Sequence, residues 1–338
     1  MVTEYDSLKA RLDAGDVLLL DGAIGTQIQE MGAPMDNAAW AAAALHTHPN
    51  TVRRMHELYI GAGCDIITTN TYSSARHNIE PLGLGDSTYE LNLRAVALAQ
   101  DARDRAARTR QVWIGGSISN FGILVGGEPR RALHRYARAR QSITAEQARA
   151  NLLEQAEILA ESGVDFLMVE STGSMEHRKW ILEACRATGL PVWTGFRCRL
   201  DPGDPVVKVG YSVDTPFAQG LGEVGAIGTD AVAIFHSLID DTTEAIKVAQ
   251  KHFSGPLVVY PEADRKDYTA TYKDETEATK VTPQEYAAMA TGWAEMGVQV
   301  IGGCCGIGLP FIRPLREALP AKAGKRAATP AAPQRARK

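Results

Sequence analysis

Two adjacent cysteines, Cys304 and Cys305, are the residues whose type and spacing point most clearly to chemistry. They lie in the segment Gly-Gly-Cys-Cys-Gly at 302–306, directly after an apolar run at 298–301. Neighbouring Cα atoms are ~3.8 Å apart and a disulfide prefers ~5.5 Å, so these thiols do not readily bond to each other. Thiols at a strand end suit a soft metal such as zinc, and the glycines allow a metal and a substrate to approach closely. The alternative is a pair of small buried hydrophobic side chains beside a turn.

The double-cysteine segment resembles the signature of the homocysteine S-methyltransferase family, which includes betaine-, S-methylmethionine- and cobalamin-dependent enzymes. Further segments match that family in the same order, at 20–26, 65–72, 116–118 and 164–170. The similarity extends from Val17 to Arg316, nearly the whole chain. It implies a zinc-dependent methyltransferase that methylates the thiolate of homocysteine and gives methionine.

The resemblance also implies a catalytic zinc with three protein ligands, of which Cys304 and Cys305 are two. In the family the third ligand is a cysteine at the end of the sixth strand. Here that segment reads Ala-Ile-Phe-His at 233–236, so the matching residue is His236. Imidazole is a good zinc ligand, and we expect Zn²⁺ held by His236, Cys304 and Cys305 as catalytic residues. Two alternatives stay open: Cys198 replaces His236 as a ligand, or the site has lost its metal.

Substrate contacts follow from the same resemblance. It implies that Glu170, at the end of the fourth strand, holds the amino group of homocysteine. The backbone around Asp21, Gly22 and Ala23 would hold the carboxylate end, and Asn70 is a further substrate-binding candidate. The alternatives are a structural ion pair for Glu170 and a structural turn for Asp21.

The methyl donor stays open among a sulfonium, S-adenosylmethionine and a betaine-type compound. A cationic donor favours aromatic faces, and six aromatic residues lie near predicted strand ends: Tyr72, Phe121, Tyr211, Phe235, Tyr260 and Tyr268. No cobalamin-binding segment is recognised, so a cobalamin route would need a separate corrinoid protein as methyl donor. The rival functions are a zinc methyltransferase for another thiol acceptor and a non-catalytic amino-acid-binding barrel.

The elements that position these residues alternate along the chain. Short runs rich in Val, Ile and Leu predict parallel strands at 17–21, 65–69, 112–116, 165–169, 192–196, 231–235, 257–260 and 298–301. Amphipathic segments predict helices at 50–62, 88–107, 145–162, 175–188, 242–252 and 283–296. This pattern predicts one α/β domain at 1–320, a (β/α)₈ TIM barrel with its site at the C-terminal face of the strands. A doubly wound sheet is disfavoured, because the segment at 22–25 lacks the three-glycine dinucleotide fingerprint.

Composition excludes several other classes. The chain has 338 residues, 45% of them hydrophobic, and its net charge of −4 gives no electrostatic case for nucleic acid as a partner. The N-terminus lacks a signal-peptide pattern and the apolar runs are strand-sized, so we expect no membrane partner. Five cysteines fit a reducing compartment, and we expect a cytoplasmic protein. The expected partners are a small-molecule thiol and a methyl donor; the oligomeric state stays open, a homo-oligomer included.

Three segments fall outside the regular pattern. Residues 321–338 carry six basic and no acidic residues among Ala and Pro, which predicts a disordered tail. Long loops at 117–143 and 261–282 follow strands on the expected catalytic face and suit lids, partner surfaces or disordered segments. The first contains an arginine-rich stretch that we expect to form an exposed helix held by local ion pairs; the alternative is a surface that binds an acidic partner or substrate.

Overall fold

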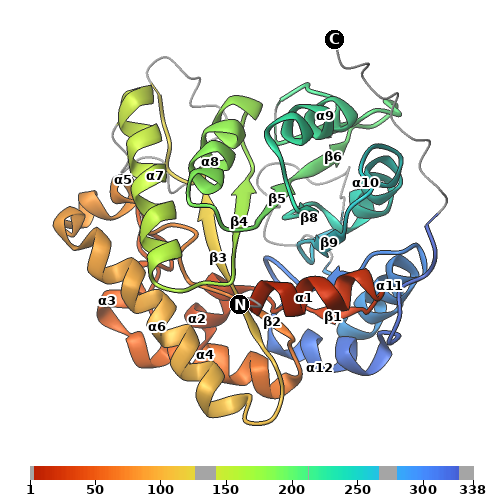
Figure 1. Cartoon of the computed structure of the whole chain (residues 1–338), viewed down its shortest axis with the longest axis horizontal. Coiled ribbons are helices and arrows are strands. Elements are labelled where there is room, and N and C mark those ends of the chain that lie inside the picture. The colour runs from red at the N-terminus through yellow and green to blue at the C-terminus, as the bar shows by residue number, and fades with distance from the viewer. Residues whose placement is uncertain (1–3, 126–141, 212, 266–279, 327–338) are drawn as a thin grey trace.

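The computed structural model describes residues 4–125, 142–211, 213–265 and 280–326, and these form a barrel of eight parallel strands (Figure 1). The barrel strands are β1 (Leu18–Leu19), β2 (Ile66–Thr68), β3 (Trp113–Ser119), β4 (Phe166–Ser171), β5 (Val192–Phe196), β8 (Ala231–Phe235), β9 (Leu257–Tyr260) and β10 (Val300–Ile301). Their order is β1-β10-β9-β8-β5-β4-β3-β2. A parallel bridge between Leu20 and Ile66 joins β1 to β2, and the N–H of Asp21 donates to the carbonyl of Ile66 at 3.0 Å. The predicted (β/α)₈ barrel is confirmed.

Helices surround the strands (Figure 1). Six were predicted: α4 (Pro49–Ala62), α6 (Thr88–Ala106), α7 (Ala145–Glu161), α8 (Met175–Ala187), α10 (Ile239–His252) and α11 (Pro283–Glu295). The others are α1 (Glu4–Asp13), α2 (Ile24–Glu30), α3 (Ala43–Thr47), α5 (Arg76–Ile79), α9 (Phe217–Ile227), α12 (Leu309–Ala318) and the 3₁₀ turns η1 (Glu80–Leu82) and η2 (Gly85–Ser87). The sequence did not predict α9 or α12, because α9 contains three glycines and α12 contains Pro314, which disfavour helices locally.

Strand alternation divides the core into an inner and an outer layer. In β4, Phe166 and Met168 belong to the cluster inside the barrel, whereas Leu167 and Val169 pack in the layer between strands and helices. Side chains of a strand alternate between its two faces, so Glu170 is the next inward position. The carboxylate of Glu170 therefore lies inside the barrel, near the carboxyl-terminal end of β4 and above the packed inner cluster.

Helix α1 lies against the opposite, amino-terminal end of the barrel. Tyr5 belongs to the inner cluster, and its hydroxyl accepts a hydrogen bond from Nε1 of Trp193 at 3.0 Å. The Nε1 of Trp113 donates to the carbonyl of Glu4 at 3.0 Å. Since this helix closes the amino-terminal end, the open mouth lies at the carboxyl ends of the strands.

A two-stranded antiparallel hairpin interrupts the alternation after β5. It consists of β6 (Cys198–Leu200) and β7 (Val207–Val209), with Arg199 opposite Lys208. It precedes α9 and has no counterpart in the predicted pattern of strands and helices. Gly210 and Tyr211 follow β7, and Tyr211 reaches the mouth of the barrel.

The expectation of a disordered tail from residue 321 is wrong for 321–326. Lys322 forms an antiparallel bridge with Asp16, and the N–H of Gly324 donates to the carbonyl of Ala294 at 2.8 Å. The guanidinium of Arg326 donates to the carbonyls of Gly255 at 2.6 Å and Gly297 at 3.2 Å. Composition correctly indicated that this segment buries few apolar side chains, but its backbone and arginine bind exposed carbonyls of the barrel. Residues 327–338 lie outside the described residues.

Most of the two long predicted loops also lies outside the described residues, at 126–141 and 266–279. The expected arginine-rich helix, Tyr268 and any lid formed by these segments therefore have no structural account. Among the helices that the structure describes, none is long and apolar enough to cross a bilayer.

Candidate active site and metal centre

A cavity of about 590 Å³ opens at the carboxyl ends of the barrel strands. Its wall combines backbone that follows β1, β2 and β10 with side chains from β4, β8 and the segment after the β6–β7 hairpin. The residues singled out from the sequence, Asp21, Asn70, Glu170, His236 and the two cysteines, all line it. The barrel thus gathers segments more than 280 residues apart in the chain around one space.

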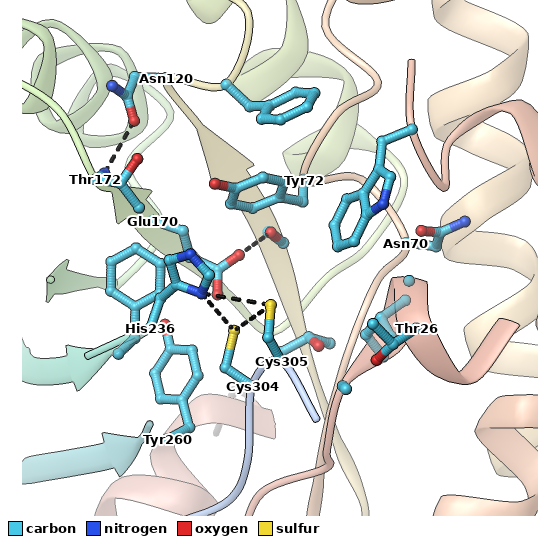
Figure 2. A pocket seen from close by; sticks show the side chains of 18 of the residues that line it. Thr26, Asn70, Tyr72, Asn120, Glu170, Thr172, His236, Tyr260, Cys304 and Cys305 are labelled. Atoms are coloured by element: carbon cyan, nitrogen blue, oxygen red, sulfur yellow. Dashed lines mark hydrogen bonds between the residues drawn. The ribbon is translucent and has the colours of Figure 1, made fainter. Parts of the chain in front are cut away.

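The imidazole of His236 and the thiols of Cys304 and Cys305 converge in this cavity (Figure 2). Nδ1 of His236 lies 3.5 Å from each Sγ atom, and the two Sγ atoms are 4.0 Å apart. A tetrahedral zinc with bonds of ~2.3 Å to sulfur and ~2.0 Å to nitrogen separates sulfur from nitrogen by ~3.5 Å and sulfur from sulfur by ~3.8 Å. The three donor atoms therefore fit a zinc ion that keeps one further position for a substrate or water.

The backbone of His236 directs its ring toward the cysteines. His236 follows β8 with φ of 46°, a left-handed conformation that is uncommon outside glycine but enriched for histidine. Its N–H donates to the carbonyl of Tyr260 at 3.1 Å, which ties this turn to β9. Such a conformation costs ~1–3 kcal/mol and persists where surrounding contacts impose it. The strain therefore lies at the histidine of the His236, Cys304 and Cys305 cluster.

Glycine permits the tight turn that presents the cysteines. A Cβ atom on Gly303 would lie 2.2 Å from the side chain of Ile307, so no other residue fits there without displacement. The N–H of Cys304 donates to the carbonyl of Pro261 at 2.8 Å, which anchors the turn to the end of β9. A hydrogen bond between the thiols lowers the pKa of Cys305 and raises that of Cys304, because Cys304 keeps the shared proton. One thiolate is therefore favoured at this site.

Glu170 is the buried carboxylate of the cavity. Its side chain accepts a hydrogen bond from the hydroxyl of Ser117 on β3 (Figure 2). Burial raises the pKa of Glu170, and the hydroxyls of Ser117 and Tyr260 partly oppose that shift. Within the described part of the chain Glu170 forms no ion pair, which removes the structural-ion-pair alternative for those residues. A buried carboxylate that has no ion pair among the described residues suits a cationic group such as an ammonium.

Three aromatic rings form another wall of the cavity. Trp40, Tyr72 and Phe121 pack against one another with ring centroids 5.4–6.2 Å apart. Gly25 on α2 makes room for this wall, because a Cβ there would lie 2.6 Å from the Trp40 ring. The sequence predicted Tyr72 and Phe121 but missed Trp40; a single tryptophan in an alanine-rich segment was the available signal.

Comparison with known proteins places this geometry in a family. Residues 18–319 match the family model described as homocysteine S-methyltransferase. The chain belongs to this family. It is 26% identical over 316 residues to a selenocysteine methyltransferase of Astragalus bisulcatus, covering 86% of this chain and 89% of that protein. It is also 26% identical over 320 residues to a homocysteine S-methyltransferase of Escherichia coli, covering 90% of this chain and 96% of the relative.

A solved structure of the E. coli homocysteine methyltransferase MmuM, in its metallated form, has a TM-score of 0.69 and 25% identity. The match covers 92% of this chain and 99% of that chain. Membership in the homocysteine S-methyltransferase family confirms the expected family and makes this chain a methyltransferase. His236 lies beside the cysteine pair, at the position where the sequence resemblance implied a third cysteine.

The backbone segment expected to receive the substrate carboxylate is partly occupied by protein contacts. The carboxylate of Asp21 accepts hydrogen bonds from the backbone and hydroxyl of Thr68, and burial raises its pKa well above the usual value. The N–H of Ala23 donates to Ile307, and its carbonyl accepts from Tyr59. Asp21 and Ala23 therefore shape the wall through structural bonds. At Gly22 a Cβ would lie 2.4 Å from a carbonyl oxygen, so glycine there serves close backbone approach.

Two further candidates have clear positions. Asn70 lines the cavity, but its amide donates to the carbonyl of Ala41 at 3.0 Å and so holds the segment before α3. Cys198 is buried, and its backbone N–H donates to Oγ of Ser237 at 2.8 Å. Among the described residues, the group whose ligand atoms lie close enough together to hold a metal consists of His236, Cys304 and Cys305, and Cys198 is not part of it.

Proposed function

We propose that this methyltransferase is zinc-dependent and transfers a methyl group from a cationic donor to the thiolate of homocysteine, giving methionine. The donor is a sulfonium, S-adenosylmethionine or a betaine-type compound. The observation that carries the proposal is the convergence of one imidazole nitrogen and two thiols at 3.5–4.0 Å beside the buried carboxylate of Glu170.

The donor set supports zinc and an activated thiol. When bound, zinc would supply a Lewis acid that keeps the acceptor thiol deprotonated, and only the thiolate is an effective methyl acceptor. His236, Cys304 and Cys305 would hold it, and one histidine with two thiolates makes the centre neutral. The acceptor sulfur would attack the methyl carbon as the bond from that carbon to the donor sulfur or nitrogen breaks, and the donor atom would leave as an uncharged thioether or amine.

Glu170 would orient the acceptor by pairing with its ammonium group. The carboxylate is buried at the end of β4, with Ser117 fixing one of its oxygens. Methyl transfer requires in-line approach of the thiolate to the methyl carbon, so positioning contributes much of the rate. Asp21, Gly22 and Ala23 line the cavity together, and the backbone of this segment would receive the carboxylate end of the acceptor.

The aromatic wall would receive the cationic donor. Trp40, Tyr72 and Phe121 line the cavity together, and aromatic faces attract sulfonium and quaternary ammonium groups by ~0.5–2 kcal/mol each. A neutral donor gains no such attraction. The wall therefore favours a cationic small molecule over a methylated corrinoid protein.

A second candidate acceptor is a thiol or selenol other than homocysteine. It is favoured by the Astragalus relative named selenocysteine methyltransferase and by His236, which alters the charge of the centre. Methyl transfer from each cationic donor to homocysteine, cysteine and selenocysteine, measured by mass spectrometry of the products, separates the candidates. Methionine formation from a sulfonium or betaine supports the proposal, and exclusive use of another acceptor contradicts it. A corrinoid partner, a homo-oligomer and a cytoplasmic location stay predictions.

A further inference from the structure

Tyr211 contacts the face of the metal centre that points away from the cysteines. Its hydroxyl lies 2.5 Å from Nε2 of His236, on the opposite side of the ring from Nδ1, which faces both sulfurs. The two rings meet edge to face, with centroids 6.0 Å apart and an interplanar angle of 80°. One imidazole is therefore bound at both nitrogens, by the cysteine pair on one side and by a phenol on the other.

The inserted hairpin holds Tyr211 in this place. Gly210, directly after β7, has φ of +74°, and a Cβ there would lie 3.0 Å from the carbonyl oxygen of Thr172. Arg197, directly after β5, donates to the carbonyl of Gly210 at 3.3 Å. Its guanidinium carbon lies 3.9 Å from the centroid of the Tyr211 ring. Backbone and ring are thus both fixed, so the hydroxyl is directed at His236.

A metal bound to Nδ1 of His236 determines that the proton of the neutral ring lies on Nε2. Neutral imidazole carries one proton, and a metal bound through the Nδ1 lone pair leaves that proton on Nε2. A partner for this N–H fixes the ring orientation and strengthens the ligand, and loss of such a partner typically weakens metal affinity 10- to 100-fold. Glu262 also faces the ring, with one carboxylate oxygen 3.7 Å from Nδ1, and so favours a proton on the wrong nitrogen when no metal is bound.

We propose that Tyr211 is a positioning residue for the metal ligand His236. Its hydroxyl oxygen accepts the hydrogen bond from Nε2–H and keeps Nδ1 directed at the metal position between the cysteines. The hydroxyl can also donate, so it pairs with Nε2 whichever nitrogen carries the proton. This inference rests on the proposed metal centre. The β6–β7 hairpin ends just before Tyr211 and so places this residue at the metal centre.

The test is the zinc affinity of the purified full chain, measured by competition with a chromophoric chelator. Tyr211→Phe removes the acceptor and keeps the ring, and we expect zinc to bind 10- to 100-fold more weakly. The cobalt(II)-substituted variant should show altered visible absorption bands, because the ligand orientation changes. Tyr89→Phe is the matched control: this tyrosine is exposed on α6, outside the cavity, and the zinc affinity of the variant should stay within about twofold of the wild type.

A double-mutant cycle separates this role from a general structural one. In the His236→Cys background residue 236 has no second ring nitrogen, so Tyr211→Phe should change zinc affinity less than twofold. Equal losses in both backgrounds overturn the inference, because Tyr211 would then support the loop alone. Wild-type zinc affinity in Tyr211→Phe also overturns it but leaves the proposed function standing. A wild-type protein that binds no zinc defeats the proposed function itself.

Discussion

Replacing Glu170 by glutamine tests how the acceptor is recognised. The substitution keeps the size and the acceptor oxygen of the side chain but removes the negative charge at the end of β4. If Glu170 pairs with the ammonium group of homocysteine, the loss affects ground state and transition state alike. The KM for homocysteine should therefore rise much more than kcat falls.

The burial of Glu170 sets the size of this effect. A charged hydrogen bond is worth ~1.5–3 kcal/mol, and the site is buried enough that solvent does not replace the lost partner. That energy corresponds to about a 10- to 150-fold increase in KM. Ser117 can still donate to the amide oxygen of glutamine, so the fold around β3 and β4 should persist.

The raised pKa of Glu170 predicts that the same substitution, although it weakens homocysteine binding, makes the metal-free protein more stable at neutral pH. Burial raises the pKa in the folded chain above the unfolded value of about 4.5, so the folded state binds the proton more readily between the two values. Stability then falls as pH rises through that window and stays reduced at neutral pH. Glutamine removes this penalty, and Glu170→Gln without metal should have a higher Tm than the wild type at pH 7 and a smaller difference near pH 4.

The assay is steady-state kinetics at saturating donor with homocysteine varied, beside thermal unfolding of metal-free protein. Glu176→Gln on the exposed face of α8 is the control and should change neither KM nor Tm. An unchanged KM for homocysteine in Glu170→Gln would remove Glu170 from amine binding. A lowered Tm at pH 7 would refute the reasoning from burial.

Two further outcomes follow from the aromatic wall and the C-terminal segment. Trp40→Ala should raise the KM for a cationic donor about 2- to 30-fold and leave the KM for homocysteine within about twofold of the wild type. Gly25→Ala places a methyl group against the Trp40 ring and should also change the KM for the donor. Equal changes in both constants would show that Trp40 supports the whole cavity instead. A chain that ends after Pro320 should lose about 2–6 °C in Tm relative to one that ends after Arg326, since it lacks the bonds of Lys322 and Arg326 to the barrel. Equal Tm values for the two chains would contradict the packing of 321–326.

The predictable parts of this protein are those set by local pattern. Continuous apolar runs such as 165–169 identify strands buried on both faces, and their alternation with helices predicts the barrel. Once the barrel is predicted, residues at the carboxyl ends of strands must meet, so Glu170, His236 and the cysteine pair were correctly expected at one mouth. Their chemical roles depend on the family resemblance and stay proposals.

The unpredicted parts depend on contacts between distant segments. Tyr211 reaches His236 because a hairpin follows β5 and because Arg197 packs on the Tyr211 ring. The periodicity of apolar residues along the sequence predicts neither contact. Arg326 binds carbonyls at Gly255 and Gly297, so a segment with the composition of a tail becomes part of the fold. The backbone hydrogen bond of Ala23 could not be predicted from the sequence either, because it depends on where Ile307 lies in three dimensions.

X-ray absorption at the zinc edge, combined with metal quantification on protein purified without chelators, tests the metal centre most directly. We predict about one zinc per chain with two sulfur ligands and one imidazole nitrogen. His236→Ala, Cys304→Ala and Cys305→Ala should each lose the metal and keep the fold, whereas His236→Cys should keep zinc with three sulfur ligands. Full zinc occupancy and activity in His236→Ala, or an active wild type without metal, would contradict the assignment.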